Sequence, residues 1–234
     1  MKESVVKDHY IHNILPRNRV TDELHIGARV ATEYLLAAMD LRPGMTVLDV
    51  GSGLGAAARL AATLYDINVT GLDLVPEFCE EARRNTQDER VSFICGSALA
   101  MDFSDESFAA AFMLHVNMNI QEKQKLFNEI ARVLHKNSQF AFYEILAGTR
   151  AGEMVYPCPW AGRAEDSFLI APDDLENILA DAGFVIEKKE NRRDFGLAAM
   201  ERRQADYPEQ PFVNLLENVR ENRCAPWQYV CRKR

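Results

Sequence analysis

The feature that most constrains the fold of this chain is the segment at 46–55, TVLDVGSGLG. A short apolar run that carries one acid breaks into alternating glycines, and an alanine-rich segment follows at 56–65. This order predicts a strand, a tight loop and a helix. Glycine lets a ligand approach the main chain, and the first turn of a helix offers unpaired N–H groups. The segment is therefore typical of a loop that binds a nucleotide-like ligand.

Strand and helix patterns alternate around this loop. Further strands are expected at 68–72, 91–95, 107–114, 139–146, 184–188 and 227–231. Helices are expected at about 22–39, 76–85, 121–134, 172–182, 195–205 and 212–222. The alternation predicts an α/β fold, in which a largely parallel sheet has helices on both faces.

The length of 234 residues suits a single domain. We expect residues 1–40 to form an N-terminal helical cap. Residues 147–171, which include YPCPW at 156–160, interrupt the alternation after the fifth strand. The two prolines remove backbone donors that a helix or central strand needs, and the segment is too long for a routine connection. We interpret it as a lid insertion.

Composition narrows the class of partner. The net charge of −8 argues against nucleic acid and against an anionic membrane surface. No apolar run reaches the length of a signal peptide or a membrane span. The five cysteines are odd in number and lack a CxxC pair, which is typical of free thiols in a reducing compartment and not of a zinc site. We therefore expect a cytoplasmic protein that acts on a small molecule and binds no metal.

Two acids indicate which ligand the loop binds. Asp73 lies 22 positions after Gly51, where an acid would hold the hydroxyls of a ribose. Gly51, Gly53 and Ala56 also satisfy a dinucleotide fingerprint with alanine in its last place. However, Asp49 stands two positions before Gly51, and its carboxylate would repel a diphosphate. A phosphate-free cofactor with an ammonium group, such as S-adenosylmethionine, fits Asp49 better.

These motifs resemble a known family. VLDVGSGLG at 47–55 resembles the first motif of class I S-adenosylmethionine-dependent methyltransferases, and GLDL at 71–74 resembles their second. At 96–98, Ser97 replaces the acid that often meets the adenine amino group. The segments at 22–27, 115–120, 143–144 and 156–160 resemble the small-molecule branch around sarcosine/dimethylglycine methyltransferases. The likeness covers roughly residues 20–190.

The resemblance implies a Rossmann-like, seven-stranded, mostly parallel sheet with an antiparallel last strand, and S-adenosyl-L-methionine as the cofactor. It implies that residues near His25 and Gly27 close over the methionine end of the cofactor, and that Ser97 and Ala98 lie near the adenine. The expected cofactor-binding residues are Asp49, Gly51, Ser52, Gly53, Asp73, Leu74, Ser97, Ala98, His115, His25 and Gly27.

Candidates for the acceptor site lie in the loop after the fourth strand and in the lid. A neutral imidazole suits a general base near neutral pH, so His115 is the catalytic candidate if the acceptor is a hydroxyl. Asn117 is a candidate for substrate contact, and Tyr10, Tyr156 and Trp160 are candidates to present aromatic faces to a cation. The alternatives are that His115 and Asn117 only order their loop and that the aromatic residues only pack the lid.

We therefore predict methyl transfer to a small-molecule amine or hydroxyl by in-line displacement, where positioning supplies most of the rate. Two alternatives stay open. Ser97 departs from the motif, which leaves room for a non-catalytic cofactor-binding protein of the same fold. An NAD-type oxidoreductase is the other alternative, and Asp49 and the absence of a pattern for a second catalytic domain argue against it.

Overall fold

A computed structural model describes residues 23–206 and 213–234, and in them seven strands form one sheet. The strands are β1 (Thr46–Val50), β2 (Asn68–Asp73), β3 (Val91–Cys95), β4 (Phe108–Leu114), β5 (Leu134–Ala147), β6 (Phe184–Asn191) and β7 (Cys224–Lys233). Their order is β3-β2-β1-β4-β5-β7-β6. The first five pair in parallel, and β7 runs antiparallel between β5 and β6. The predicted Rossmann-like sheet with an antiparallel last strand is confirmed.

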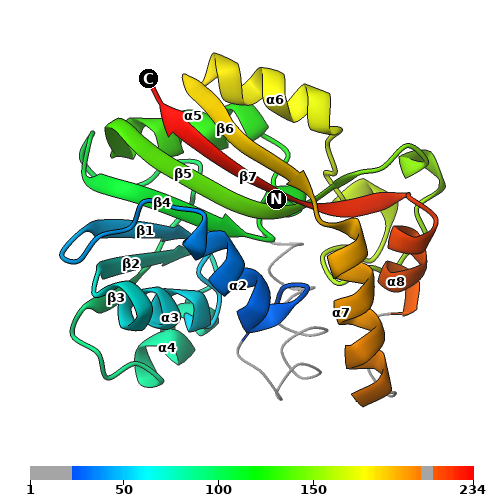
Figure 1. Ribbon diagram of the computed structural model, residues 1–234, viewed down its shortest axis with the longest axis horizontal. Helices are drawn as coiled ribbons and strands as arrows, with labels where there is room; N and C mark the ends of the chain where they lie inside the picture. Colours follow the sequence, from blue (N-terminus) through cyan, green and yellow to red (C-terminus); the bar gives the residue numbers. More distant parts are fainter. Residues whose placement is uncertain (1–22, 207–212) are drawn as a thin grey trace.

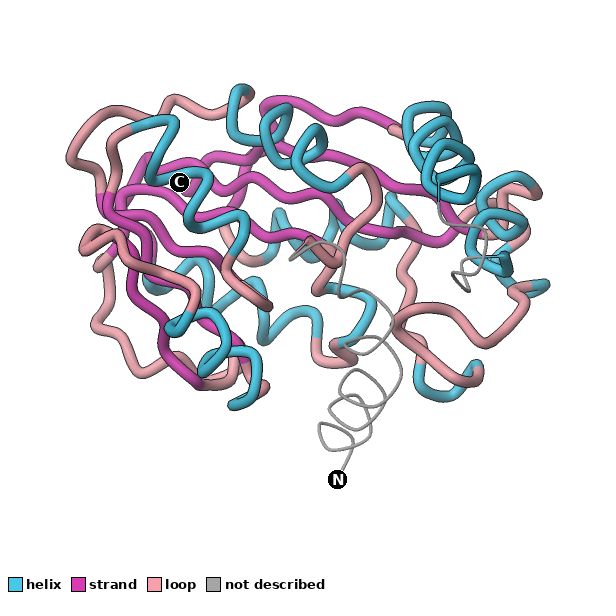
Figure 2. The backbone as a smooth tube through the Cα atoms, turned by 90° about the horizontal axis from the view of Figure 1, so that it is seen from below, coloured by secondary structure: helices cyan, strands magenta, loops and turns pink. Residues whose placement is uncertain are grey.

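Helices cover both faces of the sheet (Figures 1 and 2). They are α2 (Ala28–Ala37), α3 (Ala56–Tyr65), α4 (Pro76–Arg84), α5 (Lys123–Val133), α6 (Pro172–Asp181), α7 (Arg193–Asp206) and α8 (Val213–Arg220). Helices α5 and α6 pack on one face, and α2 and α3 pack on the other. Helices α7 and α8 lie side by side at the end of the sheet where β7 begins (Figure 1).

The central strands are apolar on both faces because both faces are covered. Successive side chains of a strand point to opposite sides. In β1, Leu48 therefore joins the core under α5 and α6, and Val47 joins the core under α2 and α3. Strand β4, FAAAFML, is buried at six of its seven positions. This packing fixes the carboxyl ends of β1 and β4, which carry the candidate site.

Three strands extend further than the apolar pattern predicts. The structure has them at 134–147, 184–191 and 224–233, against predicted ranges of 139–146, 184–188 and 227–231. In β6, charged residues continue the ladder, and Asn191 still pairs with Trp227 of β7. Backbone pairing does not require apolar side chains, and β6 is an edge strand whose polar side chains reach solvent. The apolar pattern therefore marks the buried part of each strand and misses the rest.

The helix predicted from about residue 22 begins at Ala28. The residue before it, Gly27, has φ +83°, and a Cβ there would lie 2.6 Å from the Phe195 ring. This left-handed residue separates the segment 23–26 from the helix. The rest of the predicted N-terminal cap, residues 1–22 with Tyr10, lies outside the described residues.

The predicted lid, residues 147–171, follows β5 and contains two short 3₁₀ turns, Ala151–Glu153 and Ala164–Asp166. The backbone N–H of Phe168, in this segment, donates to Met118 O at 3.0 Å and so connects the segment to the loop after β4. Among the helices that the structure describes, none has both the length and the apolar character that crossing a bilayer requires.

Candidate active site

A cavity of about 310 Å³ opens at the carboxyl ends of β1 to β4. One water-sized position takes roughly 10–15 Å³ of such volume, so the cavity has about twenty to thirty of them. That room suits a nucleoside joined to an amino acid. Of the eleven residues predicted to bind the cofactor, all but Gly27 line this main cavity.

The glycine loop, residues 51–55, forms the floor of the main cavity. The backbone N–H groups of Gly51 and Ser52 donate to Leu72 O at 2.7 and 3.0 Å, which fixes the loop to β2. Gly51 has φ +72°, and a Cβ at this position would lie 2.2 Å from Val116 Cγ2. Glycine is required here both by the left-handed conformation and by the close approach of the loop after β4.

Asp49 and Ser52 present polar atoms that fit the implied cofactor. Asp49 is 1% exposed, and burial, followed by the nearby charge of Asp73, raises its pKa well above its usual range. Within residues 23–206 and 213–234, Asp49 Oδ2 and Ser52 Oγ have no hydrogen-bond partner. A buried polar atom without a partner is costly. Both atoms belong to residues of the cavity wall, so a ligand with hydrogen-bond donors, such as an ammonium group, would satisfy them.

Asp73 accepts backbone hydrogen bonds through both of its carboxylate oxygens. Its Oδ1 accepts the backbone N–H of Val75 at 2.9 Å, just before α4, and its Oδ2 accepts that of Gly53 at 2.7 Å. Burial raises the pKa of this carboxyl, and these hydrogen bonds oppose the shift. A carboxylate oxygen accepts more than one hydrogen bond. Asp73 can therefore hold the glycine loop and still accept from a ribose hydroxyl in the cavity.

The far wall of the main cavity contains Ser97 and Ala98, which follow β3. Ser97 Oγ accepts the backbone N–H of Leu99 at 3.2 Å, so the hydroxyl helps to shape its own turn. Phe168 of the lid also lines the cavity. Sequence reasoning assigned it no role, because its position at the cavity depends on how the lid folds back.

Three rings meet at the end of the main cavity nearest α2. His115 stacks on Tyr143 with ring centroids 5.2 Å apart, and His25 lies edge-on to His115 at 5.9 Å. The Nε2–H of His25 donates to Ala28 O at 3.0 Å. Burial lowers the pKa of His25 to about 4, and burial together with His25 lowers the pKa of His115 well below its ordinary value. Both imidazoles are therefore neutral at pH 7.

His115 has φ +55°, a left-handed conformation at the end of β4. Its backbone N–H donates to Tyr143 O at 2.9 Å. In the part of the chain that the structure describes, its Nε2 has no hydrogen-bond partner. A buried, neutral imidazole with a vacant nitrogen at a cavity wall can accept a hydrogen bond from a ligand hydroxyl.

The His115 loop, residues 115–120, is held by a buried acid. Glu144 of β5 is fully buried, and its two carboxylate oxygens accept the backbone N–H groups of Val116 and Asn117 at 2.8 and 2.9 Å. Lys123 Nζ donates to the carbonyls of Asn117 and Ile120. Burial raises the pKa of Glu144 to about 8 and lowers that of Lys123 to about 7. In the sequence, Glu144 is recognisable only as an acid inside an apolar strand, and no role was predicted for it.

A second cavity of about 40 Å³ lies between the lid and helices α7 and α8. It shares Leu24, His25 and His115 with the main cavity. Trp160 lines it, is 1% exposed, and donates from Nε1 to Ser167 Oγ at 2.9 Å. Gly27, predicted to bind the cofactor, lines this second cavity and not the main one. The two histidines therefore contribute to the walls of both cavities.

The remaining predicted acceptor residues lie elsewhere. Asn117 is fully buried and lines neither cavity. Tyr156 is partly buried against the apolar cluster of the lid and α8, and it also lines neither. Tyr10 is outside the described residues. In residues 23–206 and 213–234, no group of three or more His, Cys, Asp or Glu side chains is placed to hold a metal ion.

The chain is similar in sequence to known methyltransferases. Residues 48–142 match the family model described as a methyltransferase domain. The chain is 31% identical over 185 residues to the O-methyltransferase rstn1 of Aspergillus nomiae, with 73% of this chain and 80% of that protein covered.

Solved structures share the fold. Geranyl diphosphate C-methyltransferase from Streptomyces coelicolor superposes with a TM-score of 0.78 at 16% identity, covering 88% of this chain and 80% of that one. A protein from Galdieria sulphuraria, assigned as a sarcosine dimethylglycine methyltransferase, superposes with a TM-score of 0.77 at 16% identity, covering 98% of each chain.

Proposed function

Because this chain belongs to the class I S-adenosylmethionine-dependent methyltransferases, we propose that it methylates a hydroxyl oxygen of a small molecule, with His115 as the general base. The cofactor is S-adenosyl-L-methionine. The observation that carries the proposal is the place of His115: a neutral imidazole that lines both cavities. The relative rstn1 is named an O-methyltransferase, which supports the same choice.

In this proposal the main cavity holds the cofactor. Asp49 receives the ammonium group, Asp73 accepts from the ribose, and Ser97 and Ala98 lie beside the adenine. His25 closes the end of the cavity next to the reacting groups. When bound, the cofactor supplies an electrophilic methyl group on a positively charged sulfur. Asp49 Oδ2 has no hydrogen-bond partner among the described residues, which supports this orientation.

Methyl transfer to a hydroxyl requires the chain to provide a group that removes the hydroxyl proton. As the O–CH₃ bond forms, the S–CH₃ bond breaks and the sulfur keeps the electron pair. The hydroxyl proton must leave the oxygen in the same process, and His115 is in place to take it. An amine acceptor reacts as its neutral form and needs no base for the methyl transfer itself. A positioned base contributes typically 10²–10⁴-fold to such a step.

Transfer of labelled methyl from S-adenosylmethionine tests the proposal. Matched phenols and anilines are offered to the wild-type protein, to His115→Gln and to His135→Gln, a control at an exposed histidine. We expect phenols to be labelled, and His115→Gln to lower kcat on them roughly a hundredfold or more. Cofactor affinity, measured by calorimetry, should hold within about threefold.

Two results would overturn the proposal. Labelling of anilines without labelling of any phenol would show that the acceptor is an amine. An unchanged kcat on phenols in His115→Gln would show that His115 is not the general base.

A further inference from the structure

Two of the five cysteines lie between the ends of β2 and β3 and the first turns of α4. Cys79 Sγ, on α4, is 3.5 Å from Asp73 O and 3.7 Å from Ile94 O, and its thiol can donate to either carbonyl. Cys95 Sγ, at the end of β3, donates to Leu74 O at 3.8 Å. Because Asp73 pairs with Cys95 across the two strands, both sulfurs are held against the same pair of strand ends.

The two thiols also contact each other. Burial raises the pKa of Cys79 to about 12, and the charges of Asp73 and Cys95 and a hydrogen bond with the Cys95 thiol add to this shift. Helix α4 packs directly on β3, so the backbones that carry the two cysteines are neighbours. Side chains already in contact need little movement to form a disulfide.

The two thiols differ in their access to solvent. Cys95 is exposed, whereas Cys79 is 1% exposed. The thiolate is the reactive form of cysteine, and with its raised pKa Cys79 keeps its proton at pH 7. An oxidant therefore reacts first with Cys95. An accessible cysteine next to a second cysteine that can resolve it is the arrangement of redox-sensing thiols.

We propose that Cys79 and Cys95 form a reversible disulfide in the presence of a peroxide, and that this disulfide weakens cofactor binding. The proposal goes beyond methyl transfer and does not depend on the acceptor. Its effect on affinity rests on the cofactor position proposed above, whereas formation of the disulfide does not.

The reaction balances with one molecule of hydrogen peroxide. The Cys95 thiolate attacks one peroxide oxygen, the O–O bond breaks, and Cys95 becomes a sulfenic acid while hydroxide leaves and is protonated to water. Cys79 then attacks the Cys95 sulfur, so the S–S bond forms and the S–O bond breaks. The departing hydroxide takes the proton that Cys79 gives up. In total the two thiols lose two electrons and two protons, and the peroxide becomes two molecules of water.

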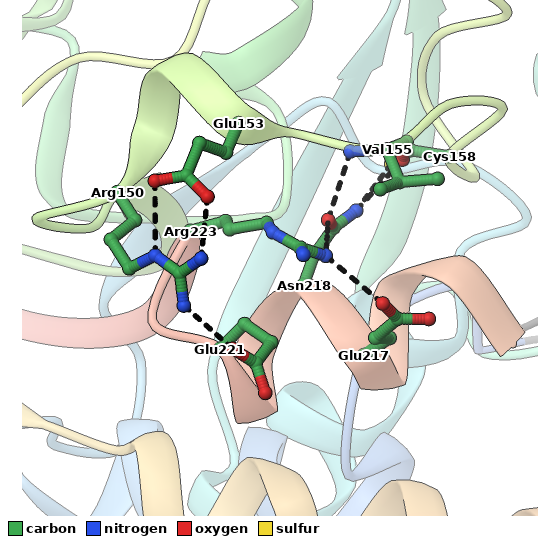
Figure 3. A network of polar contacts seen from close by, with 8 residues as sticks. All are labelled: Arg150, Glu153, Val155, Cys158, Glu217, Asn218, Glu221 and Arg223. Atoms are coloured by element: carbon green, nitrogen blue, oxygen red, sulfur yellow. Dashed lines mark hydrogen bonds and ion pairs between the residues drawn. The ribbon is translucent and has the colours of Figure 1, made fainter.

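The other three cysteines, Cys158, Cys224 and Cys231, are all buried. Cys158 lies near Cys224, because burial and then the charge of Cys158 raise the pKa of Cys224. Figure 3 shows how the lid beside Cys158 is fixed: Asn218 of α8 accepts the backbone N–H of Val155 at 3.0 Å and donates to Val155 O at 2.8 Å. We therefore expect an oxidant to reach Cys95 before any of these three.

The disulfide would act on the edge of the main cavity. Asp73 O and Leu74 O each accept from one of the two thiols, and a disulfide has no hydrogen to donate. Both of these residues line the main cavity, and the Asp73 carboxylate also holds the N–H of Gly53 at 2.7 Å. Movement of the end of β2 would therefore displace the ribose acceptor and the glycine loop together.

Cofactor and oxidation should oppose each other. If the disulfide weakens binding of S-adenosylmethionine, then by linkage the bound cofactor disfavours the disulfide by the same factor. We therefore expect saturating cofactor to slow formation of the disulfide.

Peptide mapping by mass spectrometry tests formation of the disulfide. The full-length protein is treated with hydrogen peroxide, free thiols are blocked by alkylation, and the digest is analysed without reductant. We expect one cross-linked peptide that joins Cys79 to Cys95 and that disappears after treatment with dithiothreitol. This reductant leaves methionine sulfoxide unchanged, so recovery of function with it separates the disulfide from oxidised methionine.

Calorimetry with S-adenosylmethionine tests the effect on binding. For the wild-type protein, we expect peroxide to raise the Kd about tenfold or more and dithiothreitol to restore it. Cys95→Ser, at an exposed position, should bind the cofactor as the reduced wild-type protein does and should not respond to peroxide. Cys79→Ser should also fail to respond, and Cys231→Ala, which removes a thiol outside the pair, should respond as the wild type does. Cys95→Ser tests the proposal even if a substitution at the buried Cys79 lowers the yield of folded protein.

Three results would overturn the proposal. One is a peroxide-treated protein in which Cys79 remains a free thiol, whether Cys95 is oxidised alone or not at all. Another is a disulfide between Cys158 and Cys224 in its place. The third is a Cys79–Cys95 disulfide that leaves the Kd for the cofactor unchanged. An amine acceptor would overturn the proposed function and leave all of these readouts unaffected.

Discussion

The carboxylate of Asp73 accepts the backbone N–H of Gly53 at 2.7 Å. The acid at the end of β2 is thereby bonded to the glycine loop that follows β1. Its other oxygen accepts the N–H of Val75 before α4. One side chain thus links two neighbouring loops and shapes the floor of the main cavity.

Asp73→Asn should weaken both the fold and the site. An amide oxygen replaces only one carboxylate oxygen, and the amide nitrogen would face an N–H donor. We expect the free energy of unfolding to fall by about 1–3 kcal/mol and the Kd for S-adenosylmethionine to rise about tenfold or more. Urea unfolding and calorimetry measure the two effects. Unchanged values of both would show that the Asp73 hydrogen bonds are unimportant.

Asp49→Asn should separate binding from stability. Asp49 is buried, and its Oδ2 lacks a partner among the residues described here. Removal of a buried charge without a partner does not destabilise a fold, so the free energy of unfolding should hold or rise. Loss of the carboxylate should raise the Kd for the cofactor about tenfold or more, because a charge-assisted hydrogen bond disappears. Asp181→Asn, at an exposed acid, is the control, and equal affinities of the two variants would exclude Asp49 from the ammonium site.

His25→Gln should reduce the acid sensitivity of the fold. Burial lowers the pKa of His25 to about 4 in the folded state, whereas the unfolded chain titrates near 6.5. Below pH 6.5 the unfolded chain therefore binds a proton that the folded chain does not, and stability is lost as the pH falls towards 4. Glutamine can keep the donor to Ala28 O.

Between pH 7 and pH 5, the wild-type protein should lose about 2 kcal/mol more unfolding free energy than His25→Gln. Urea unfolding at the two pH values measures this difference, and buried groups that do not interact with His25 contribute equally in both proteins. Equal losses in the two proteins would mean that His25 titrates normally.

Glu144→Gln should act on turnover through the His115 loop. Glutamine keeps one acceptor for the N–H groups of Val116 and Asn117 and loses the other. We expect kcat to fall about tenfold or more, because His115 is displaced, while the Kd for the cofactor stays within about threefold. Glu80→Gln, at an exposed position on α4, is the control. An equal loss of cofactor affinity would indicate general damage and not loss of positioning.

The parts of the fold that local patterns encode were predicted from the sequence. The glycine loop, Asp49 and Asp73 fall at strand ends, and parallel strand ends meet at one edge of a sheet, so their convergence follows from the alternation alone. The antiparallel direction of β7 was predicted from the family resemblance and not from local patterns.

The unpredicted parts depend on contacts between distant segments. Glu144 reaches Val116 and Asn117 only because β5 pairs with β4 in one register. The second cavity exists only where the lid, α7 and α8 meet, so no spacing along the chain marks Met200 or Arg203. Trp160 was named as an acceptor candidate, and its place beside that cavity required the bonds from Asn218 to the lid.

One measurement tests the central claim most directly. An aminophenol offers a hydroxyl and an amine on one ring, and S-adenosylmethionine with a ¹³C-labelled methyl group supplies the label. The ¹³C NMR shift of the product then identifies the methylated atom. We predict a methoxy group, formed by the wild-type protein and lost in His115→Gln. An N-methyl product would contradict O-methylation and the role of His115 as its base.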